Sequence, residues 1–368
     1  MWEYKKVVLL ADYGSLELAN KVYCHLEKRD IPGGMHEFSQ SDLCISRFKN
    51  GEIDVVVDRN VRGRDVFVLK SCNIFNGSVG KGEKPESLEY DPNNSYMELF
   101  LINDAIKKAA ASSIIDVMPY MPYQRQDRRP KRQLSDQGSG RKIVRGPISS
   151  RLFADFAAVS GAKGIVTLDP HFKQIEGFYG LVLDCLESNI LFAEYLEKTY
   201  GSRLEDLIIV APDHGAAERA AELAGIFNLP IAICDKRRLK PGVADLKAII
   251  SDTELEGKIC AIFDDLVDSG GTLILAADAL RARGASEVIA CCTHPVLSLG
   301  AKDKLLDAGL KLVTTNSIAI PDIGKYPNII VLDLSKILAE AIYCICAGKS
   351  LSSLLFDYKR YKKEISKD

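Results

Sequence analysis

Short apolar segments rich in β-branched residues recur along the chain, and each ends in polar residues. Stretches with helical spacing, such as 150–159, 216–223 and 272–283, lie between many of them. Alternation of strand-like and helix-like segments is typical of parallel sheets covered by helices, so the pattern predicts an α/β fold. The segments expected to form strands are 7–10, 66–69, 114–117, 164–168, 207–210, 231–234, 259–263, 288–291 and 329–332.

Polar motifs follow several of the expected strands. In open sheets of parallel strands, ligands bind beyond the carboxyl ends of the strands, so the residues after each strand are candidate site residues. The motifs in these places are Pro119-Tyr120 with the basic run behind it, Asp169-Pro170-His171, Asp213-His214-Gly215, Asp235-Lys236-Arg237-Arg238 and Asp264-Asp265.

The composition is that of a globular protein and excludes several classes of partner. The 368 residues allow two domains of ordinary size, each with its own core. The formal net charge of −2 gives no attraction of the whole chain to nucleic acid or to a membrane surface. No apolar run approaches the roughly 20 residues of a membrane span, and the apolar stretch near the N-terminus is too short for a signal peptide. We therefore expect a cytoplasmic protein that binds neither nucleic acid nor membrane.

The cysteine pattern indicates the same compartment. The ten cysteines are scattered and include no C-x-x-C pair with metal spacing. Reduced, mostly buried thiols are therefore favoured over disulfides or a zinc site.

The segment 262–272 carries the most specific signal of the chain. An apolar run ends in the carboxylates Asp264 and Asp265, a third acid, Asp268, follows, and Ser269-Gly270-Gly271-Thr272 opens a helical stretch. Hydroxyls and backbone N–H groups at a helix N-terminus can bind an anion, and nearby carboxylates suit sugar hydroxyls. The spacing differs from the Walker phosphate loop and from the dinucleotide G-x-G-x-x-G turn. The motif therefore indicates a ligand that has both a phosphate and a sugar.

Two basic motifs suit contacts with phosphate. Arg125-Gln126-Asp127 offers a bidentate guanidinium together with amide and carboxylate groups for a base or a ribose. Lys236 and Arg238 would lie on the same side of an extended segment, where they could neutralise charge that develops on transferring phosphate oxygens. For each motif the alternative is a solvated basic stretch of the surface.

Two further motifs are weaker by themselves. Asp169 and His171 place a carboxylate and an imidazole just past a strand, where they could help to hold Mg²⁺, although His is an unusual ligand for that ion. Phe48, Asn50 and Glu52 lie in a turn where an aromatic ring could stack on adenine and an acceptor could bind its amino group. The alternatives are a structural histidine and a hairpin turn with a core phenylalanine.

Two segments have the composition of loops added to this scaffold. Residues 76–95 contain several Gly, Pro and Asn residues with charges, and residues 128–146 carry seven Lys or Arg and little apolar content. The second loop could cover a phosphate-rich ligand. The alternative for both is a solvated excursion without a role.

Taken in this order, the motifs resemble the ribose-phosphate pyrophosphokinase family, the phosphoribosyl pyrophosphate (PRPP) synthetases, along nearly the whole chain. The resemblance implies two phosphoribosyltransferase-like domains, each a mainly parallel sheet flanked by helices. We expect the first at 1–184, joined by part of the C-terminal segment, the second at 185–350, and a charged tail at 351–368. Further segments that carry the resemblance are 14–19, 61–67, 96–99, 147–149, 174–178, 338–342 and 348–352.

The family transfers the β,γ-diphosphoryl group of ATP to the C1 hydroxyl of ribose 5-phosphate with Mg²⁺, giving PRPP and AMP for nucleotide biosynthesis. The resemblance therefore implies ATP and ribose 5-phosphate as ligands, and a homo-oligomer whose adenine site is shared between subunits. The implied roles are ATP binding by Phe48, Asn50, Glu52, Arg125, Gln126 and Asp127, metal binding by Asp169, His171 and Asp213, catalysis by His171, Lys236 and Arg238, and ribose 5-phosphate binding by Asp264, Asp265, Asp268, Ser269, Gly270, Gly271 and Thr272.

Some positions depart from the pattern of the family. Asn50 stands where Asp is usual and keeps an acceptor without the charge, Pro170 stands where Leu is usual, and Gly180 stands where an acid is common. His214 and Ala216 stand where the family often has a small or apolar residue and a second Gly.

Two other classes of protein stay as alternatives. A salvage phosphoribosyltransferase uses the same sugar-phosphate loop but does not need the R-Q-D run, the D-x-H motif or the Lys236/Arg238 pair. A catalytically silent regulatory subunit would lose these motifs, which are all present. The sequence therefore favours the active enzyme.

Overall fold

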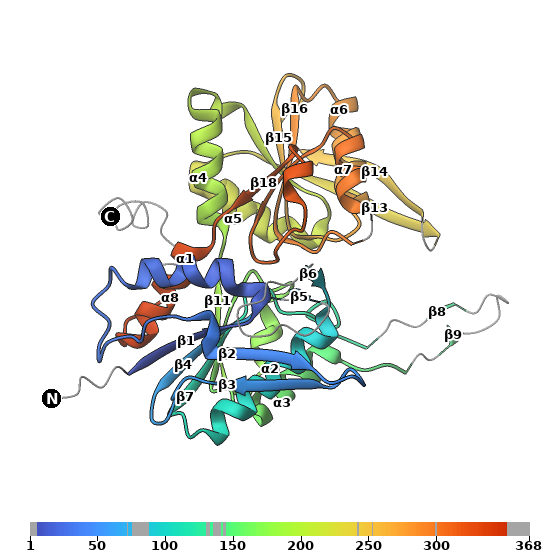
Figure 1. The fold of residues 1–368 in the computed structure, drawn as a ribbon. Coiled ribbons are helices and arrows are strands. Elements are labelled where there is room, and N and C mark those ends of the chain that lie inside the picture. Colours follow the sequence, from blue (N-terminus) through green and yellow to red (C-terminus); the bar gives the residue numbers. More distant parts are fainter. Residues whose placement is uncertain are drawn as a thin grey trace. The chain divides into compact units, whose positions relative to one another are not determined.

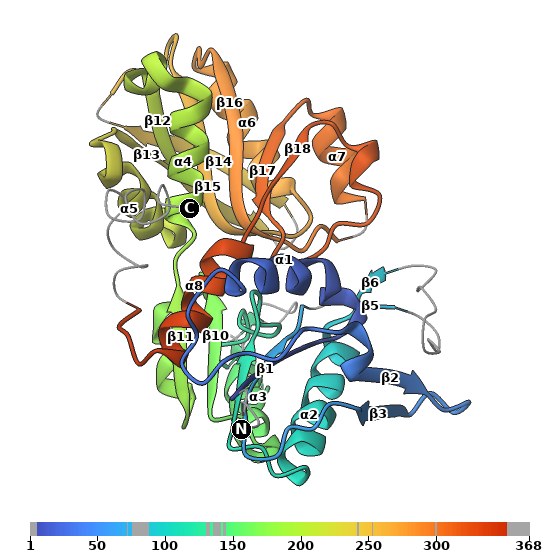
Figure 2. The same ribbon diagram turned by 60° about the vertical axis from the view of Figure 1, so that its left-hand side comes forward.

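The computed structural model describes residues 6–71, 73–75, 88–129, 133–134, 141–142, 145–240, 243–251, 253–298 and 300–351, with the backbone alone at 73–75, 88–90, 133–134, 141–142, 236–240 and 243–248. The chain forms two compact units (Figure 1, Figure 2). Unit 1 comprises Met1–Cys185 with Ala341–Gly348, and unit 2 comprises Leu186–Glu340 with Lys349–Asp368. Most of the predicted loops at 76–95 and 128–146, and the tail from 352 onward, lie outside the described residues.

Unit 1 is built on a five-stranded sheet with the order β1-β4-β7-β10-β11. The pairs β1–β4, β4–β7 and β7–β10 are parallel, so the carboxyl ends of these strands meet at one edge of the sheet. The strands of the sheet are β1 Val7–Ala11, β4 Asp65–Leu69, β7 Ser113–Val117, β10 Gly164–Leu168 and β11 Val182–Leu186. The other elements are the helices α1 Leu16–Leu26, α2 Pro92–Lys108 and α3 Ser149–Ser160, and the short antiparallel pairs β5 Asn73–Phe75 with β6 Leu88–Tyr90 and β8 Gln133–Leu134 with β9 Arg141–Lys142.

An antiparallel ribbon of β2 (Leu43–Arg47) and β3 (Ile53–Val57) packs on α2, outside the main sheet (Figure 1). Leu43 and Ile45 of the ribbon are buried in the same core as Leu99 of α2. A two-stranded ribbon is at best marginally stable by itself, so its packing on α2 is what keeps it in place.

Unit 2 contains a seven-stranded sheet with the order β14-β13-β12-β15-β16-β17-β18. β14 pairs antiparallel with β13, and the other neighbours pair parallel. The strands are β12 Leu207–Ala211, β13 Ile231–Lys240, β14 Val243–Ser251, β15 Ile259–Val267, β16 Glu287–Pro295, β17 Lys311–Thr315 and β18 Ile329–Leu332. The helices are α4 Asn189–Tyr200, α5 Ala217–Phe227, α6 Gly271–Ala282, α7 Ala301–Asp307 and α8 Ser335–Cys346, the last of which extends into the residues of unit 1.

The sheet of unit 2 is covered by helices on both faces, as the interior strand β12 shows. Ile208 and Val210 pack in one apolar cluster with α6, whereas Leu207 and Ile209 pack in another with α4 and α5. A strand buried on both faces needs apolar residues at consecutive positions, which explains the unbroken sequence LIIVA of β12. The predicted α/β fold with mainly parallel sheets flanked by helices is confirmed.

All nine segments expected to form strands do so, but β13, β15 and β16 extend well beyond their predicted ends, β16 as far as Pro295. β13 continues to Lys240 because β14 pairs along it, and β15 continues to Val267 because β16 pairs along it, with Asp264 opposite Cys292. The expectation that Lys236, Arg238, Asp264 and Asp265 follow their strands is therefore wrong, since these residues lie within the strands.

None of the helices in the described parts of the chain is long and apolar enough to cross a membrane. The nine cysteines in these parts are free thiols, as expected, and Cys72 lies outside them.

Candidate functional site

In unit 1, polar residues follow four neighbouring strands at the carboxyl edge of the sheet. Asp12 follows β1, Lys70 follows β4, the segment 119–127 follows β7 and Asp169 follows β10. Because these strands are parallel, their motifs lie at the same edge. This arrangement is the one that the sequence pattern predicts for a ligand site.

The motif Asp169-Pro170-His171 has a constrained backbone. Asp169 is 6% exposed and has φ of +33°, and Tyr123 in the neighbouring segment has φ of +64°. Positive φ is unfavourable for side chains other than glycine and often accompanies a functional site. His171 is exposed, and its backbone N–H donates to Oε1 of Gln124 at 2.8 Å. The structure thereby joins the D-P-H motif to the segment that carries the basic run.

The run Arg125-Gln126-Asp127 lies directly after that contact. Arg125 and Gln126 are exposed and Asp127 is half-buried. The side-chain oxygen of Gln126 accepts a hydrogen bond from Ser149 Oγ at 2.6 Å. The run is therefore attached to the start of α3, and Arg125 within it is an exposed residue.

The turn between β2 and β3 presents Phe48, whose side chain is 58% exposed. The N–H of Phe48 donates to the carbonyl of Glu52 at 2.9 Å, and the N–H of Glu52 donates to Asn50 Oδ1 at 3.2 Å. Gly51 has φ of +91°, which a turn of this shape requires. The alternative of a core phenylalanine is wrong, because the ring lies at the surface.

In unit 2, Asp213 follows β12 and caps the short helix that starts there. Its Oδ1 accepts the N–H groups of Gly215 at 2.9 Å and Ala216 at 3.3 Å. Beside it, His214 Nε2 lies 3.4 Å from Oδ1 of Asp235 in β13. Asp213 therefore lies at the carboxyl edge of the sheet, next to the strand that carries Lys236 and Arg238.

Lys236 and Arg238 both belong to β13, where Lys236 is opposite Leu246 and Arg238 is opposite Ala244 of β14. Their side chains lie outside the described part of the structure. The backbone is extended at both positions, as is required for the predicted placement of the two cations on the same side of an extended segment.

The adjacent acids of β15 have different surroundings. Asp265 is buried, and its Oδ1 lies 3.3 Å from Nη1 of Arg219 in α5. Burial, followed by the neighbouring Asp265 carboxylate and by Asp213, raises the pKa of Asp264 well above its usual value. A cation or a donor such as a sugar hydroxyl at this position would relieve the repulsion between these acids.

The loop after β15 leads into the N-terminus of α6. Gly270 has φ of +76° and precedes Gly271, the first residue of the helix. A Cβ atom at Gly270 would contact Leu305, with Cγ at 3.4 Å, so the positive φ is the main restriction at this position. The N–H of Ser298 donates to the carbonyl of Asp268 at 3.1 Å and attaches the other end of the loop to the chain after β16.

The residues predicted to hold a metal are distributed over the two units: Asp169 and His171 belong to unit 1, and Asp213 belongs to unit 2. Within the described parts of the chain, no three His, Cys, Asp or Glu side chains gather as a metal cage. Mg²⁺ does not need such a cage, because it is usually held by one or two carboxylates together with substrate phosphates and water. The buried carboxylate of Asp169 at the carboxyl edge of the sheet fits that kind of donor.

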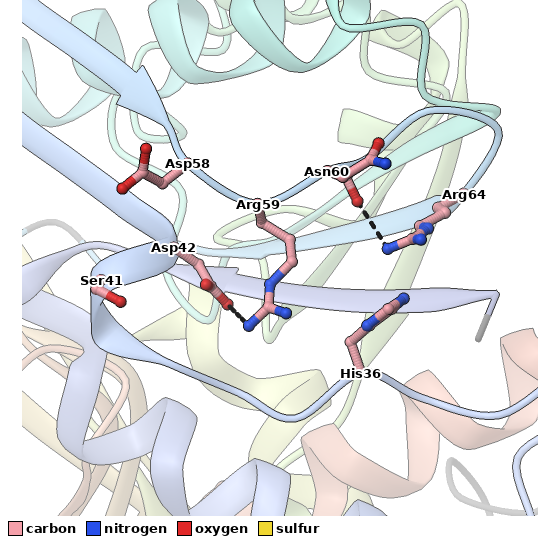
Figure 3. Close-up of a pocket in the computed structure, with 7 residues that line it drawn as sticks. All are labelled: His36, Ser41, Asp42, Asp58, Arg59, Asn60 and Arg64. Carbon is pink, nitrogen blue, oxygen red and sulfur yellow. Dashed lines mark hydrogen bonds and ion pairs between the residues drawn. The ribbon is translucent and has the colours of Figure 1, made fainter. Parts of the chain in front are cut away.

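A cavity of about 470 Å³ opens among residues that flank the β2–β3 ribbon (Figure 3). Arg59 and Asp42 form an ion pair of 2.8 Å in it. None of the predicted site residues lines this cavity. The lining residues are His36, Ser41, Asp42, Asp58, Arg59, Asn60 and Arg64.

Two residues with evident roles at these edges are missing from the sequence prediction. Gln124 holds the backbone of His171, and Arg219 faces Asp265. The available signals are weak: Gln124 directly precedes the basic run, and Arg219 is the one cation in the helix sequence AERAAELAGIF.

Comparison with known proteins gives matches along both units. The family model of the N-terminal domain of ribose phosphate pyrophosphokinase matches residues 7–161, and that of the phosphoribosyl transferase domain matches residues 182–321. A ribose-phosphate pyrophosphokinase from Bacillus caldolyticus is 40% identical over 314 residues, which cover 85% of this chain and 89% of the relative. The one from Bacillus subtilis (strain 168) is 38% identical over 312 residues, which cover 84% of this chain and 88% of the relative. The crystal structure of phosphoribosylpyrophosphate synthetase from Mycobacterium smegmatis superposes with a TM-score of 0.75 at 30% identity, over 94% of this chain and 100% of that one.

Proposed function

The chain belongs to the ribose-phosphate pyrophosphokinase family, and from this membership we propose how its own residues carry the reaction. The protein is a ribose-phosphate diphosphokinase, which transfers the β,γ-diphosphoryl group of ATP to the C1 hydroxyl of ribose 5-phosphate and gives PRPP and AMP. The observation that carries this conclusion is the identity of 40% over 85% of the chain with a ribose-phosphate pyrophosphokinase.

We propose that unit 1 binds ATP. Adenine stacks on Phe48, whose exposed ring supports this role, while Asn50 and Glu52 offer acceptors to its amino group. Arg125, Gln126 and Asp127 contact the rest of the nucleotide, and the guanidinium of the exposed residue Arg125 suits a bidentate phosphate contact.

We propose that Mg²⁺ is bound with ATP by Asp169, His171 and Asp213, directly or through water. The ion would neutralise charge on the phosphate oxygens when bound. The support for Asp169 is its buried oxygen donor, and the support for His171 is the hydrogen bond that fixes its backbone to Gln124.

Unit 2 is proposed to hold the sugar. The Asp264 and Asp265 carboxylates accept hydrogen bonds from ribose hydroxyls, and the loop from Asp268 to Thr272 binds the 5-phosphate. The start of α6 supports the second assignment, because a helix N-terminus attracts anions.

Transfer requires no covalent nucleophile on the protein. The C1 hydroxyl attacks in line, and we propose that Lys236, Arg238 and His171 stabilise the charge that develops on the moving diphosphoryl group. Catalysis then rests on position and electrostatics, as in other phosphoryl transfers.

We further propose a homo-oligomer in which the adenine site is completed by a second subunit. Unit 1 carries large apolar side chains at its surface, which supports this assignment: Phe48, Val56, Met97, Leu152, Phe156 and Val159 are all more than 40% exposed. The free thiols of the described cysteines agree with a reducing compartment, and we propose that the enzyme acts in the cytoplasm.

Product analysis tests this function. Purified protein with ATP, ribose 5-phosphate and Mg²⁺ is expected to release AMP in equal amount to PRPP. Formation of ADP would contradict diphosphoryl transfer. Consumption of PRPP together with a base would identify a salvage phosphoribosyltransferase, and the absence of any product would identify a regulatory subunit.

A further inference from the structure

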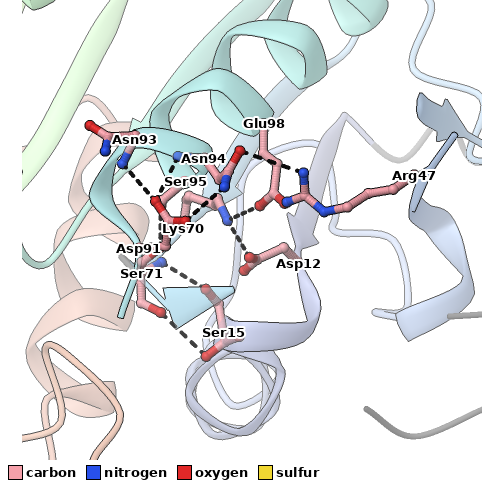
Figure 4. A network of polar contacts seen from close by, with 11 residues as sticks. Asp12, Ser15, Arg47, Lys70, Ser71, Asp91, Asn93, Asn94, Ser95 and Glu98 are labelled. Atoms are coloured by element: carbon pink, nitrogen blue, oxygen red, sulfur yellow. Dashed lines mark hydrogen bonds and ion pairs between the residues drawn. The ribbon is translucent and has the colours of Figure 1, made fainter. Parts of the chain in front are cut away.

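Lys70 is completely buried at the carboxyl end of β4, between two carboxylates (Figure 4). Its Nζ donates to Glu98 Oε2 at 2.7 Å and to Oδ2 of Asp12. Asp12 follows β1 and Glu98 lies in α2, and their side chains are 3% and 5% exposed. A buried ammonium group is strongly destabilising without such partners, so these three groups have to stay together.

Glu98 extends this array to Arg47. Its Oε1 accepts from Arg47 Nη2 at 2.9 Å, and Arg47 Nη1 lies 3.5 Å from Oδ1 of Asn94. Asn94 is fixed at the start of α2 by donating its Nδ2 to Asp91 at 2.7 Å. Burial raises the pKa of Glu98, whereas Lys70 and Arg47 favour its charged form. Lys70 therefore helps to keep ionised the carboxylate that Arg47 binds.

Arg47 is the last residue of β2, and the residue after it, Phe48, begins the turn. The hydrogen bonds from Phe48 to Glu52 and from Gly51 to Phe48 fix the shape of the turn but not its direction relative to α2. The ion pair between Arg47 and Glu98 connects this end of the ribbon to α2. Arg47, which makes this ion pair, directly precedes the aromatic residue Phe48, which is 58% exposed.

We propose that Lys70 is a positioning residue for ATP: with Asp12 it fixes Glu98, which through Arg47 sets the orientation of Phe48. The inference rests on the proposed assignment of adenine to Phe48. Buried ion pairs are a poor means of adding stability, but they require one geometry because a displaced partner is left unpaired in the core. An array of this kind selects one direction of the ribbon over others.

The test compares substitutions along the array by steady-state kinetics and thermal unfolding. Lys70→Met and Arg47→Met are each expected to raise the KM for ATP about tenfold, the size expected for a lost charged hydrogen bond. The KM for ribose 5-phosphate should stay within about twofold, because the residues proposed to bind this sugar belong to unit 2 and the array belongs to unit 1. Arg47→Lys keeps the charge and should restore part of the affinity. The matched control is Asp104→Asn, which breaks an exposed ion pair with Lys108 on the same helix and should change neither KM.

A double substitution separates positioning from general damage. If Arg47 acts through Phe48, Arg47→Met should raise the KM for ATP no further in a Phe48→Ala background. Additive effects, equal rises of both KM values, or a loss of thermal stability alone would overturn the inference. If Lys70→Met fails to fold, the KM values of Arg47→Met test the array instead. Arg47 is partly exposed, and its removal leaves the ion pairs of Lys70 with Asp12 and Glu98 in place.

The same variants distinguish failure of this inference from failure of the adenine assignment. If Phe48→Ala raises the KM for ATP but Arg47→Met does not, only the positioning role is wrong. If Phe48→Ala leaves that KM unchanged, the adenine assignment is wrong and the positioning role falls with it.

Discussion

A hydrogen bond of 2.8 Å joins the side chain of Gln124 to the backbone N–H of His171, although 47 positions separate the two residues in the sequence. Gln124 is 1% exposed, so its oxygen is held in place by the core of unit 1. The contact fixes the chain directly after Asp169, where the backbone has positive φ. It therefore joins the proposed metal residues to the proposed nucleotide residues.

Removing this acceptor should weaken metal-dependent activity. We expect Gln124→Met to raise the Mg²⁺ concentration for half-maximal rate about threefold to tenfold, because a hydrogen bond of this kind contributes about 0.5–1.5 kcal/mol to holding the segment in place. Gln124→Glu keeps an acceptor oxygen and replaces the Nε2 group, for which the described residues provide no hydrogen-bond partner, with a second oxygen; burial favours the neutral form of this carboxyl, so the variant should retain more activity. Titration of the rate with Mg²⁺ measures the difference. Equal losses in both variants would contradict the role of the acceptor.

Replacing Lys236 tests the proposed transition-state role. Lys236→Ala is expected to lower kcat by at least about a hundredfold while the affinity for ribose 5-phosphate changes little, because the charge acts chiefly in the transition state. Steady-state kinetics with direct measurement of sugar binding separates the two effects. A comparable loss of binding and of kcat would mean that Lys236 only binds substrate.

The two glycines at the start of α6 should respond differently to alanine. Gly270→Ala forces a side chain into positive φ, beside Leu305, and should lower the free energy of unfolding by about 1–2 kcal/mol. Gly271→Ala is the matched control, since its Cβ would meet only Ser269 Oγ at 3.9 Å and it is already helical. Urea unfolding of both variants checks the prediction. Equal stability of the two would show that the φ of Gly270 is not a constraint.

Asp116 should make the stability of unit 1 depend on pH. Its side chain is completely buried in β7, where Oδ2 accepts from Asn103 Nδ2 at 3.0 Å, and burial raises its pKa to about 7. Between the unfolded value of 3.8 and about 7, the folded chain keeps a proton that the unfolded chain has lost. The contribution of Asp116 to stability is therefore present at low pH, declines as the pH rises through this window, and stays constant above it.

The variant Asp116→Asn removes that titration. We expect its stability relative to the unchanged protein to rise by up to about 4 kcal/mol between pH 4 and pH 8, since one pKa unit corresponds to about 1.4 kcal/mol. Denaturant unfolding of both proteins at several pH values gives this difference, in which other titrating groups cancel. A difference that does not change with pH would place the pKa of Asp116 near its ordinary value.

Most of the strands that the sequence pattern predicted have unbroken apolar runs, although β7 includes Asp116 and β10 includes Thr167. β12 is an example, because it is buried on both faces and needs apolar residues throughout. β14 was not predicted, since it lies at the edge of its sheet and mixes Asp245 and Lys247 with apolar residues. The β2–β3 ribbon was seen only as a turn, because its burial comes from α2, which is distant in the sequence.

Candidate site residues could be found from sequence where they lie at the carboxyl ends of predicted strands. The roles assigned to them remain predictions. The contacts that such residues make with other segments of the chain could not be predicted from the sequence pattern. The hydrogen bond between Gln124 and His171 and the ion pair between Arg219 and Asp265 each join separate segments, and nothing in the local pattern of either segment reports the other.

Helix α8 determines when unit 1 can complete its fold during synthesis. The part of α8 from Ala341 onward belongs to unit 1, together with the residues to Gly348, and the guanidinium of Arg29 lies 5.5 Å from the ring of Tyr343. The ribosome therefore has to translate all of Leu186–Glu340 before Ala341–Gly348, the last segment of unit 1, can pack with the rest of that unit. At about 5–20 residues per second, this delay lasts roughly eight to thirty seconds. During that time the surface that receives α8 is uncovered, so nascent chains stalled within unit 2 are natural targets for chaperones.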